Sequence, residues 1–323
     1  MSLYTLRDWA VDYDILDTDM TKMIENLTKK SGLLQTMMVQ PASHNMFHRY
    51  ALAENLPTAG FRLINGSITP SKATSKIQQE DLVELNALDE RDKRLVESSP
   101  LQNDAVFASD SPQYIESMGQ TLSKQFFYGT TGAGDADGYQ GLRQLAIANG
   151  KSITGSGTEG SSTTIFAVRW QKGVMTGLFD PSTFNSGNPI NMEMVSDGKP
   201  YPAVTNVSTG AKKFLYGMLY SASLGLLGAG IANVACYTRI QDDTSDKPTA
   251  ANMDKLIELI EGYSNTEDTF IYLNGRALRL LQELKVSKLT TAVYDEEHSK
   301  WLRYWDTIPL IVDDNLINTE DYS

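Results

Sequence analysis

Residues 56–88 read LPTAGFRLINGSITPSKATSKIQQEDLVELNAL, a long polar stretch with short alternation of apolar residues. The Asn65-Gly66 pair predicts the tight turn of a hairpin, because both residue types tolerate positive φ. Residues 75–88 are the expected returning strand. A two-stranded ribbon of this kind buries little against itself and is marginal in water. We therefore expect the ribbon to pack against something outside its own domain.

Outside this stretch, helices and strands are interleaved without the regular order of βαβ units. The clearest predicted helix spans 111–128, with Ser111 as N-cap, Pro112 at N1 and Gly129 at its end. Further helices are expected at 19–30, 250–261 and 275–284, and strands at 163–170, 174–179, 234–240, 269–273 and 308–312. The first two of these strands are expected to pair across a turn at 171–173. This order favours an α+β fold.

Composition excludes several functional classes. The 323 residues include 40 Asp and Glu against 28 Lys and Arg, which gives a net charge of −12. Such a balance argues against a protein that grips nucleic-acid backbones or an anionic membrane surface, since both tasks need cations. The single Cys236 excludes an internal disulfide, and three histidines leave little for soft-metal sites or His-based triads. We expect an acidic intracellular protein that is poor in catalytic side chains.

One uncharged run, residues 214–237, has the length of a membrane span. Several glycines dilute its hydrophobicity, and they fit a break between two shorter buried elements equally well. The buried-core interpretation is favoured over a membrane helix.

Few residues combine into a catalytic or metal-binding pattern. The Gly- and Asp-rich loop 129–138 matches neither a phosphate loop nor a calcium loop and is interpreted as a plain turn. His44 and His48, four residues apart, could share a helix face but lack a third ligand, so they are interpreted as an ordinary, partly exposed pair. Cys236 is expected to be a small buried hydrophobe. Adjacent carboxylates are interpreted as solvated surface: Glu80/Asp81, Asp242/Asp243 and Asp313/Asp314. We expect no catalytic residue, no cofactor and no bound metal.

Several segments, in this order, resemble the major capsid proteins of tailed bacteriophages with the Hong Kong 97-like fold. The ribbon sequence from Leu56 is similar to the start of that family's extended loop. Phe127-Tyr-Gly followed by Asp137-Gly-Tyr-Gln-Gly-Leu, the stretch 163–181, and the closing stretch 308–320 continue the family order. The resemblance covers about residues 50–320, and the collinear set is more specific than any one motif. The chain departs from the pattern at Arg143, which begins Arg-Gln-Leu where the family has Arg-Tyr-Ser, and at Phe166, where it has Trp.

The resemblance implies a domain plan. Residues 1–50 would form an N-terminal arm, 51–95 the extended loop, and 96–180 the peripheral domain, with the spine helix 111–128 and the start of the axial domain. A variable insertion or loop would occupy 181–210, the rest of the axial domain 211–307, and a closing strand with a C-terminal tail 308–323. The function implied is non-catalytic self-assembly into an icosahedral shell around the phage genome. The alternatives are an acidic intracellular hydrolase that uses Asp or Glu, and a single-span membrane protein through 214–237.

The resemblance also implies partners. Copies of the chain would form pentamers and hexamers, and scaffold and portal proteins are expected beside them. The shell would enclose double-stranded DNA without sequence-specific binding, away from any membrane, after assembly in the host cytoplasm, and the final location would be the virion. The extended loop would lie over a neighbouring subunit, which makes six ribbon residues candidates for intersubunit contact: Arg62, Asn65, Lys72, Lys76, Glu80 and Asp81.

Overall fold

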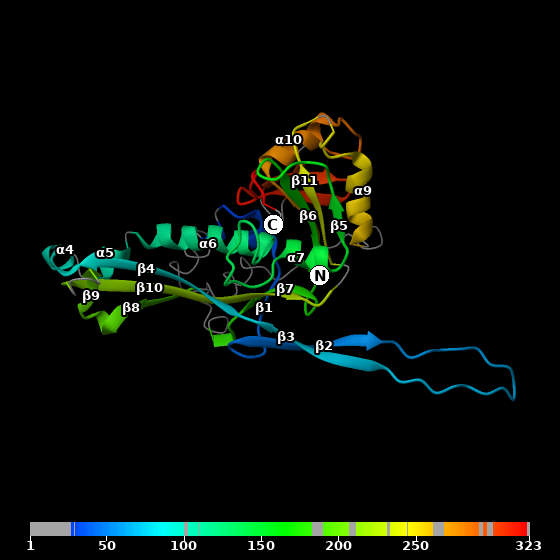
Figure 1. Cartoon of the computed structure of the whole chain (residues 1–323), viewed down its shortest axis with the longest axis horizontal. Coiled ribbons are helices and arrows are strands. Elements are labelled where there is room, and N and C mark those ends of the chain that lie inside the picture. Colours follow the sequence, from blue (N-terminus) through cyan, green and yellow to red (C-terminus); the bar gives the residue numbers. More distant parts are fainter. Residues whose placement is uncertain are drawn as a thin grey trace.

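A computed structural model of the chain describes residues 27–28, 30–99, 103–108, 110–182, 190–206, 211–230, 233–243, 245–260, 268–290, 293–295 and 300–321. Most of the predicted helix 19–30 lies outside these residues. The described part comprises a six-stranded sheet, a seven-stranded sheet and a separate two-stranded ribbon (Figure 1). Helices and sheets of this mixed kind confirm the predicted α+β class.

The six-stranded sheet is built around one long strand, β10 (Ala211–Gly228). Strand β4 (Val83–Asp92) pairs with one edge of β10. The other edge pairs in succession with β9 (Tyr201–Asn206), β8 (Asn191–Met194) and β7 (Met175–Phe179), and β1 (Val39–Pro41) extends the sheet from β7. The segment expected as a loop at 181–210 thus contributes two of these strands and the 3-10 turn η1 (Val195–Gly198).

Helix α6 (Ser111–Tyr128) runs along one face of this sheet (Figure 1). Its residues Met118 and Leu122 share a core with Ala222 and Leu224 of β10. The predicted limits of the helix are confirmed, except that Asp110 takes the N-cap position and Ser111 is the first helical residue. Two short helices, α4 (Lys93–Ser98) and α5 (Asn103–Ala108), precede α6 at the far end of the sheet.

Two glycines bring backbone segments close to α6. Gly129 ends the helix with φ 67°, a conformation that favours glycine. A Cβ at Gly119 would lie 2.0 Å from the carbonyl oxygen of Leu27, so only glycine lets this segment approach. The next element, α3 (Gly32–Thr36), carries the buried residues Leu33 and Leu34. Part of the segment expected as an N-terminal arm is therefore core of the subunit.

The seven-stranded sheet has the order β13-β14-β15-β12-β6-β11-β5. The bounds of three strands agree with those predicted from the sequence: β11 (Val234–Ile240), β12 (Thr269–Leu273) and β15 (Ile308–Val312). The others are β5 (Ser152–Thr154), β6 (Thr163–Arg169), β13 (Val293–Asp295) and β14 (Lys300–Trp305). Helices α9 (Ala250–Leu259) and α10 (Gly275–Glu283) pack on this sheet, and α7 (Leu142–Ala148) contacts β11.

The predicted pairing of strands 163–170 and 174–179 is wrong. The turn at 171–173 exists, with Gly173 at φ 75°, but β6 and β7 belong to different sheets. Both edges of β6 are occupied, by β11 and β12, so the chain leaves that sheet and β7 pairs with β1 and β10 instead. A turn between two apolar strands therefore does not identify their partners.

The uncharged run 214–237 divides between β10 and β11, with a break after Gly228. This confirms the interpretation as two shorter elements. Among the described residues, no helix is long and apolar enough to cross a membrane.

Candidate functional site

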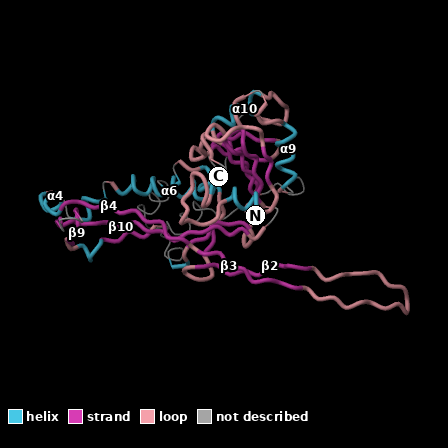
Figure 2. Tube along the Cα trace, in the orientation of Figure 1, coloured by secondary structure: helices cyan, strands magenta, loops and turns pink. Residues whose placement is uncertain are grey.

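The most exposed part of the described chain is the ribbon, residues 47–81. Strand β2 (Phe47–Asn55) pairs in antiparallel register with β3 (Thr74–Asp81), and the chain between them extends far from both sheets (Figures 1 and 2). A turn lies at the predicted place, but its central residues are Ile64 and Asn65: Asn65 has φ 68°, and the Gly66 amide donates a 2.9 Å hydrogen bond to the Leu63 carbonyl. The two strands are joined by residues 56–73 and not by a two-residue Asn-Gly turn. The ribbon is therefore a defined hairpin arm.

The returning strand is shorter than residues 75–88. It ends at Asp81, and after Leu82 the chain enters β4, which pairs with β10 in the body of the subunit. Alternation of apolar residues continues across this junction, so the sequence pattern does not reveal the change of partner.

Large apolar side chains on the ribbon are exposed to solvent. Phe61 and Ile64, next to the turn, are essentially fully exposed. Further apolar side chains of the ribbon are exposed over a smaller fraction of their surface: Leu56, Leu63, Ile68 and Ile77. Exposed apolar side chains gathered on one element mark a surface that binds another molecule.

Polar contacts fix the ribbon near its base. The Tyr50 hydroxyl donates to Gln78 at 2.9 Å and to Glu80 at 3.0 Å. Burial, together with the Glu80 charge, raises the pKa of Tyr50, and partial burial raises the pKa of Glu80. Farther out, Ser71 Oγ accepts from the Thr58 amide and donates to the Thr58 carbonyl, tying the two sides together.

The six candidate contact residues occupy two places on the ribbon. Arg62 and Asn65 lie at the turn, where Arg62 donates to the Gly66 carbonyl at 3.2 Å. Lys72 and Lys76 are exposed along the returning side. Glu80 is half-buried against Tyr50, and Asp81 accepts from Gln79 at 2.7 Å, so this pair belongs to the base of the ribbon and not to its tip.

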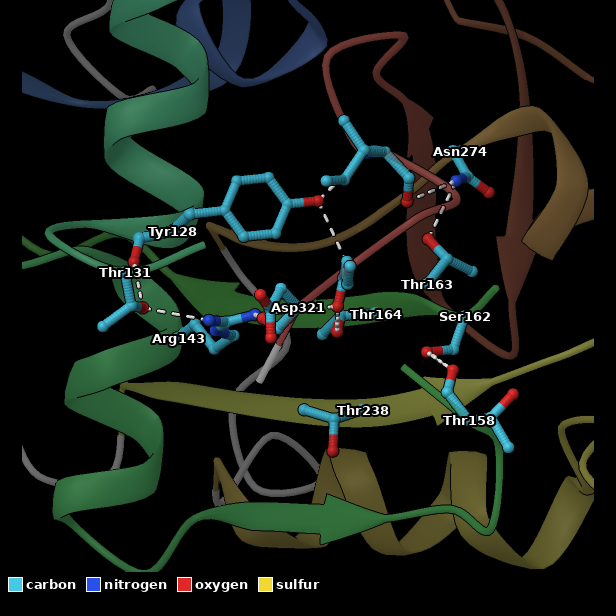
Figure 3. Close-up of polar contacts among 12 residues, drawn as sticks. Tyr128, Thr131, Arg143, Thr158, Ser162, Thr163, Thr164, Thr238, Asn274 and Asp321 are labelled. Atoms are coloured by element: carbon cyan, nitrogen blue, oxygen red, sulfur yellow. Dashed lines mark hydrogen bonds and ion pairs between the residues drawn. The ribbon is translucent and has the colours of Figure 1, made fainter. Parts of the chain in front are cut away.

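A second polar cluster lies inside the subunit, where the C-terminal residues meet β6, α6 and α7 (Figure 3). Glu320 is fully buried and accepts hydrogen bonds from Thr164 Oγ1 at 2.5 Å and from the Tyr128 hydroxyl at 3.0 Å. Arg143 lies 3.9 Å from the Glu320 carboxylate and donates to Thr131 and to the Asp321 carbonyl. Burial raises the pKa of Tyr128 well above its usual value, so its hydroxyl remains a donor.

The interpretation of Asp313 as solvated surface is wrong, whereas its neighbour Asp314 is exposed. The Asp313 carboxylate accepts from Ser31 Oγ at 3.0 Å, from the Leu33 amide at 2.9 Å and from the Asn315 side chain at 2.9 Å. It thereby joins α3 to the C-terminal segment. Neither Asp313 nor Glu320 carries a sequence signal for burial, because each stands in a short polar tail after β15.

The remaining chemistry candidates have structural roles. His48 lies on β2 and His44 in the preceding loop, stacked on Phe47, so they share no helix face. Cys236 is buried as expected, and burial raises the pKa of its thiol to about 12. Within the described part of the chain, no group of three His, Cys, Asp or Glu side chains could hold a metal ion.

The loop 129–138 is a turn held by Gln125. Its side chain donates to the Tyr139 carbonyl at 2.8 Å and accepts from the Asp135 amide at 2.7 Å. These contacts join the end of α6 to the loop that leads into α7.

Comparisons with known proteins identify the family and the fold of the chain. The family described as "Major capsid protein GP7" matches residues 16–322. A chain in the structure of bacteriophage Epsilon15 shares the fold with a TM-score of 0.55 at 17% identity, covering 88% of this chain and 86% of that one. A chain of the bacteriophage JBD30 capsid has a TM-score of 0.50 at 10% identity, covering 94% and 97%.

No curated protein matches the chain significantly. The likeness to the two phage structures confirms the Hong Kong 97-like fold. Because the family match extends over almost the whole sequence, the chain belongs to the major capsid protein GP7 family: it is a structural protein that assembles with copies of itself into a phage capsid, not an enzyme.

Proposed function

We propose that the ribbon, residues 47–81, is an intersubunit arm that lies across a neighbouring copy of the chain in the shell. The observation that carries this proposal is the exposure of Phe61, Leu63 and Ile64 at the turn, far from both sheets. Removing such side chains from water is worth about 1.5–3 kcal/mol each. In a closed shell, a neighbouring copy of the chain buries these side chains.

The six candidate residues divide their roles within this arm. Arg62, Asn65, Lys72 and Lys76 are the contact residues at and near the tip, since they are exposed beside the apolar side chains. Glu80 and Asp81 set the direction of the arm through their contacts with Tyr50 and Gln79.

The rest of the chain follows the capsid plan. The long helix α6 and the six-stranded sheet form the peripheral domain, and the seven-stranded sheet with α9 and α10 forms the axial domain at the centre of pentamers and hexamers. An icosahedral shell that contains both pentamers and hexamers needs each copy to adapt its contacts. An arm that is attached to the subunit at one end allows this adaptation.

The remaining partners are proposed from the same plan. Scaffold and portal proteins direct assembly in the host cytoplasm, and the finished shell encloses double-stranded DNA. The net charge of −12 supports a container that does not bind DNA tightly, because each phosphate contact requires a cation.

Replacing residues 56–73 by Asn-Gly tests the arm. Asn55 and Thr74 are register partners, so a two-residue turn can join β2 to β3 while β4, which begins at Val83, stays intact. We expect the variant to unfold at the same urea concentration as the native chain and to form no shells in electron micrographs. Shells of normal size and yield would contradict the proposal. The control replaces only Thr69 by Ala, which keeps the arm and should keep assembly.

A further inference from the structure

The sequence contains three Asn-Gly pairs, and the structure gives each a different environment. They are Asn65-Gly66, Asn149-Gly150 and Asn274-Gly275. In such a pair the main-chain nitrogen of the glycine can attack the side-chain amide carbon of the asparagine, because glycine has no Cβ to shield that nitrogen. The environment decides which pair can reach the geometry that this attack needs.

The pair in the ribbon is open to solvent and held by few contacts. Asn65 and Gly66 are both exposed, in the loop that extends beyond β2 and β3 (Figures 1 and 2). Within the described segment 56–73, the bond from the Gly66 amide to the Leu63 carbonyl is the only hydrogen bond between main-chain groups. Opening the turn breaks this one bond and exposes no core residue. Segments of this kind open at a low free energy.

The pair at the end of α7 is more restrained. Asn149 is the C-cap residue of this helix. The Gly150 amide donates to the Ile147 carbonyl at 3.0 Å. The next amide, that of Lys151, donates to the Ala146 carbonyl at 2.8 Å. To attack the side chain, the Gly150 nitrogen has to turn away from its acceptor, which also frays the end of the helix.

The pair at the start of α10 is fixed on its side-chain amide. Asn274 is 3% exposed, and its side-chain oxygen accepts from the Ala277 amide at 2.9 Å. Its side-chain nitrogen donates to Thr163 at 2.8 Å (Figure 3) and to Asn318 at 2.9 Å. Turning this amide toward the Gly275 nitrogen leaves several buried groups unsatisfied, which is costly. Asn274 is therefore protected in the folded chain.

The charge around the ribbon turn also favours the attack. The attacking species is the glycine nitrogen after it has lost its proton. Arg62 donates from its guanidinium to the Gly66 carbonyl at 3.2 Å. Residues 55–79 contain two further cations, Lys72 and Lys76, and no acidic residue. Nearby cations stabilise a negative charge that develops on the nitrogen.

We propose that Asn65 is a site of spontaneous modification in the subunit outside the shell, where the Gly66 nitrogen closes a succinimide ring on the Asn65 side chain. The bond from the Gly66 nitrogen to Asn65 Cγ forms, the bond from Cγ to Nδ2 breaks, and ammonia leaves with the proton of the main-chain amide. Water then opens the ring at either carbonyl and gives aspartate or isoaspartate. The turn gains a negative charge beside Arg62, whatever the ribbon contacts in the shell.

Peptide mapping of the folded chain during incubation tests the site. Trypsin releases Asn65 within residues 63–72 and Asn149 within residues 144–151. By mass spectrometry, we expect conversion to be at least about tenfold faster at Asn65 than at Asn149, since the ribbon turn opens at a lower free energy. The rate at Asn65 should rise with pH, because hydroxide removes the amide proton. Equal rates at the two positions, or an Asn65 that keeps its amide, would overturn the proposal.

The unfolded chain separates the effect of the fold from that of the sequence. In guanidinium chloride the three pairs lose their different environments, so we expect them to convert at similar rates. If Asn65 remains faster than the other two by the same factor, the flanking residues select the site and the structural argument is wrong.

Gly66→Ala separates ring closure from direct hydrolysis of the side chain by water. The added Cβ would lie 3.1 Å from the Leu63 carbonyl oxygen, a contact that an exposed turn can relieve. We expect conversion of Asn65 in this variant to be at least about tenfold slower, because the Cβ restricts the approach of the nitrogen. The native chain should contain isoaspartate at this position. Conversion of G66A at the native rate, or aspartate as the sole product, would show that no ring forms.

Discussion

The ribbon and the closing segment, residues 308–321, distribute polar and apolar side chains in opposite ways. The ribbon exposes Phe61 and Ile64 and has few contacts with the rest of its own chain. The closing segment buries two carboxylates, Asp313 and Glu320, and surrounds each with donors from distant elements. The ribbon leaves apolar side chains exposed, whereas the closing segment uses its buried polar groups for contacts within its own subunit.

This difference separates two kinds of substitution. A buried carboxylate with several donors cannot be removed without leaving those donors unsatisfied, which costs about 1–3 kcal/mol per group. An exposed side chain on the ribbon tip leaves nothing unsatisfied in the subunit. Changes in the closing segment should therefore lower the free energy of unfolding, and changes at the ribbon tip should affect only assembly.

The largest expected effect on stability is that of Glu320→Ala. It leaves the Thr164 and Tyr128 hydroxyls without their acceptor and removes the carboxylate next to Arg143. We expect the free energy of unfolding to fall by about 3–4 kcal/mol, measured by urea titration. The matched change at an exposed position, Glu84→Ala, should cost less than about 0.5 kcal/mol. Equal losses at both positions would contradict the contrast between buried and exposed carboxylates.

Asp313→Ala should have a somewhat smaller effect. It removes the acceptor for Ser31, Leu33 and Asn315 and so loosens α3 from the closing segment. We expect a loss of about 2–3 kcal/mol and faster proteolytic cleavage near residues 30–36. The neighbouring Asp314 is exposed, and Asp314→Ala should leave both quantities unchanged. Cleavage at the native rate in Asp313→Ala would show that other contacts hold α3.

Local signals in the sequence were sufficient for elements that carry their own start and stop. Pro112 and Gly129 bound α6, and apolar runs between polar residues bound β12 and β15. Strand pairing could not be predicted from such signals. Strands β6 and β7 have similar apolar sequences and a turn between them, yet they belong to different sheets. Which edge of a strand is free to pair depends on the whole fold, so a short stretch of sequence does not reveal it.

The ribbon and the buried carboxylates were also unequally visible in the sequence. The Asn65-Gly66 turn and the missing packing partner identified the ribbon from sequence. The burial of Glu320 was not visible, because its donors come from residues more than 150 positions away.

Thr164→Val separates the role of one donor from that of the whole carboxylate cluster. The hydroxyl of Thr164 is buried and donates to Glu320, so replacing it with a methyl group leaves a buried carboxylate oxygen with one partner fewer. We expect a loss of about 1–2 kcal/mol by urea titration, less than for Glu320→Ala. A loss as large as that of Glu320→Ala would mean that this one hydrogen bond dominates the cluster.

The smallest expected effect, with the opposite sign, is that of Thr176→Val. Thr176 is as buried as Thr164, but its hydroxyl has no hydrogen-bond partner among the described residues. Burying an unpaired hydroxyl is unfavourable, and a valine of nearly the same shape removes that cost without opening a cavity. We expect the free energy of unfolding to rise by up to about 1 kcal/mol, measured by urea titration beside Thr164→Val. The same substitution then has opposite effects at two equally buried strand positions, because only one of the two hydroxyls belongs to the network of the closing segment. A loss at Thr176 equal to that at Thr164 would show that burial of the residue, and not its hydrogen bond, sets the cost.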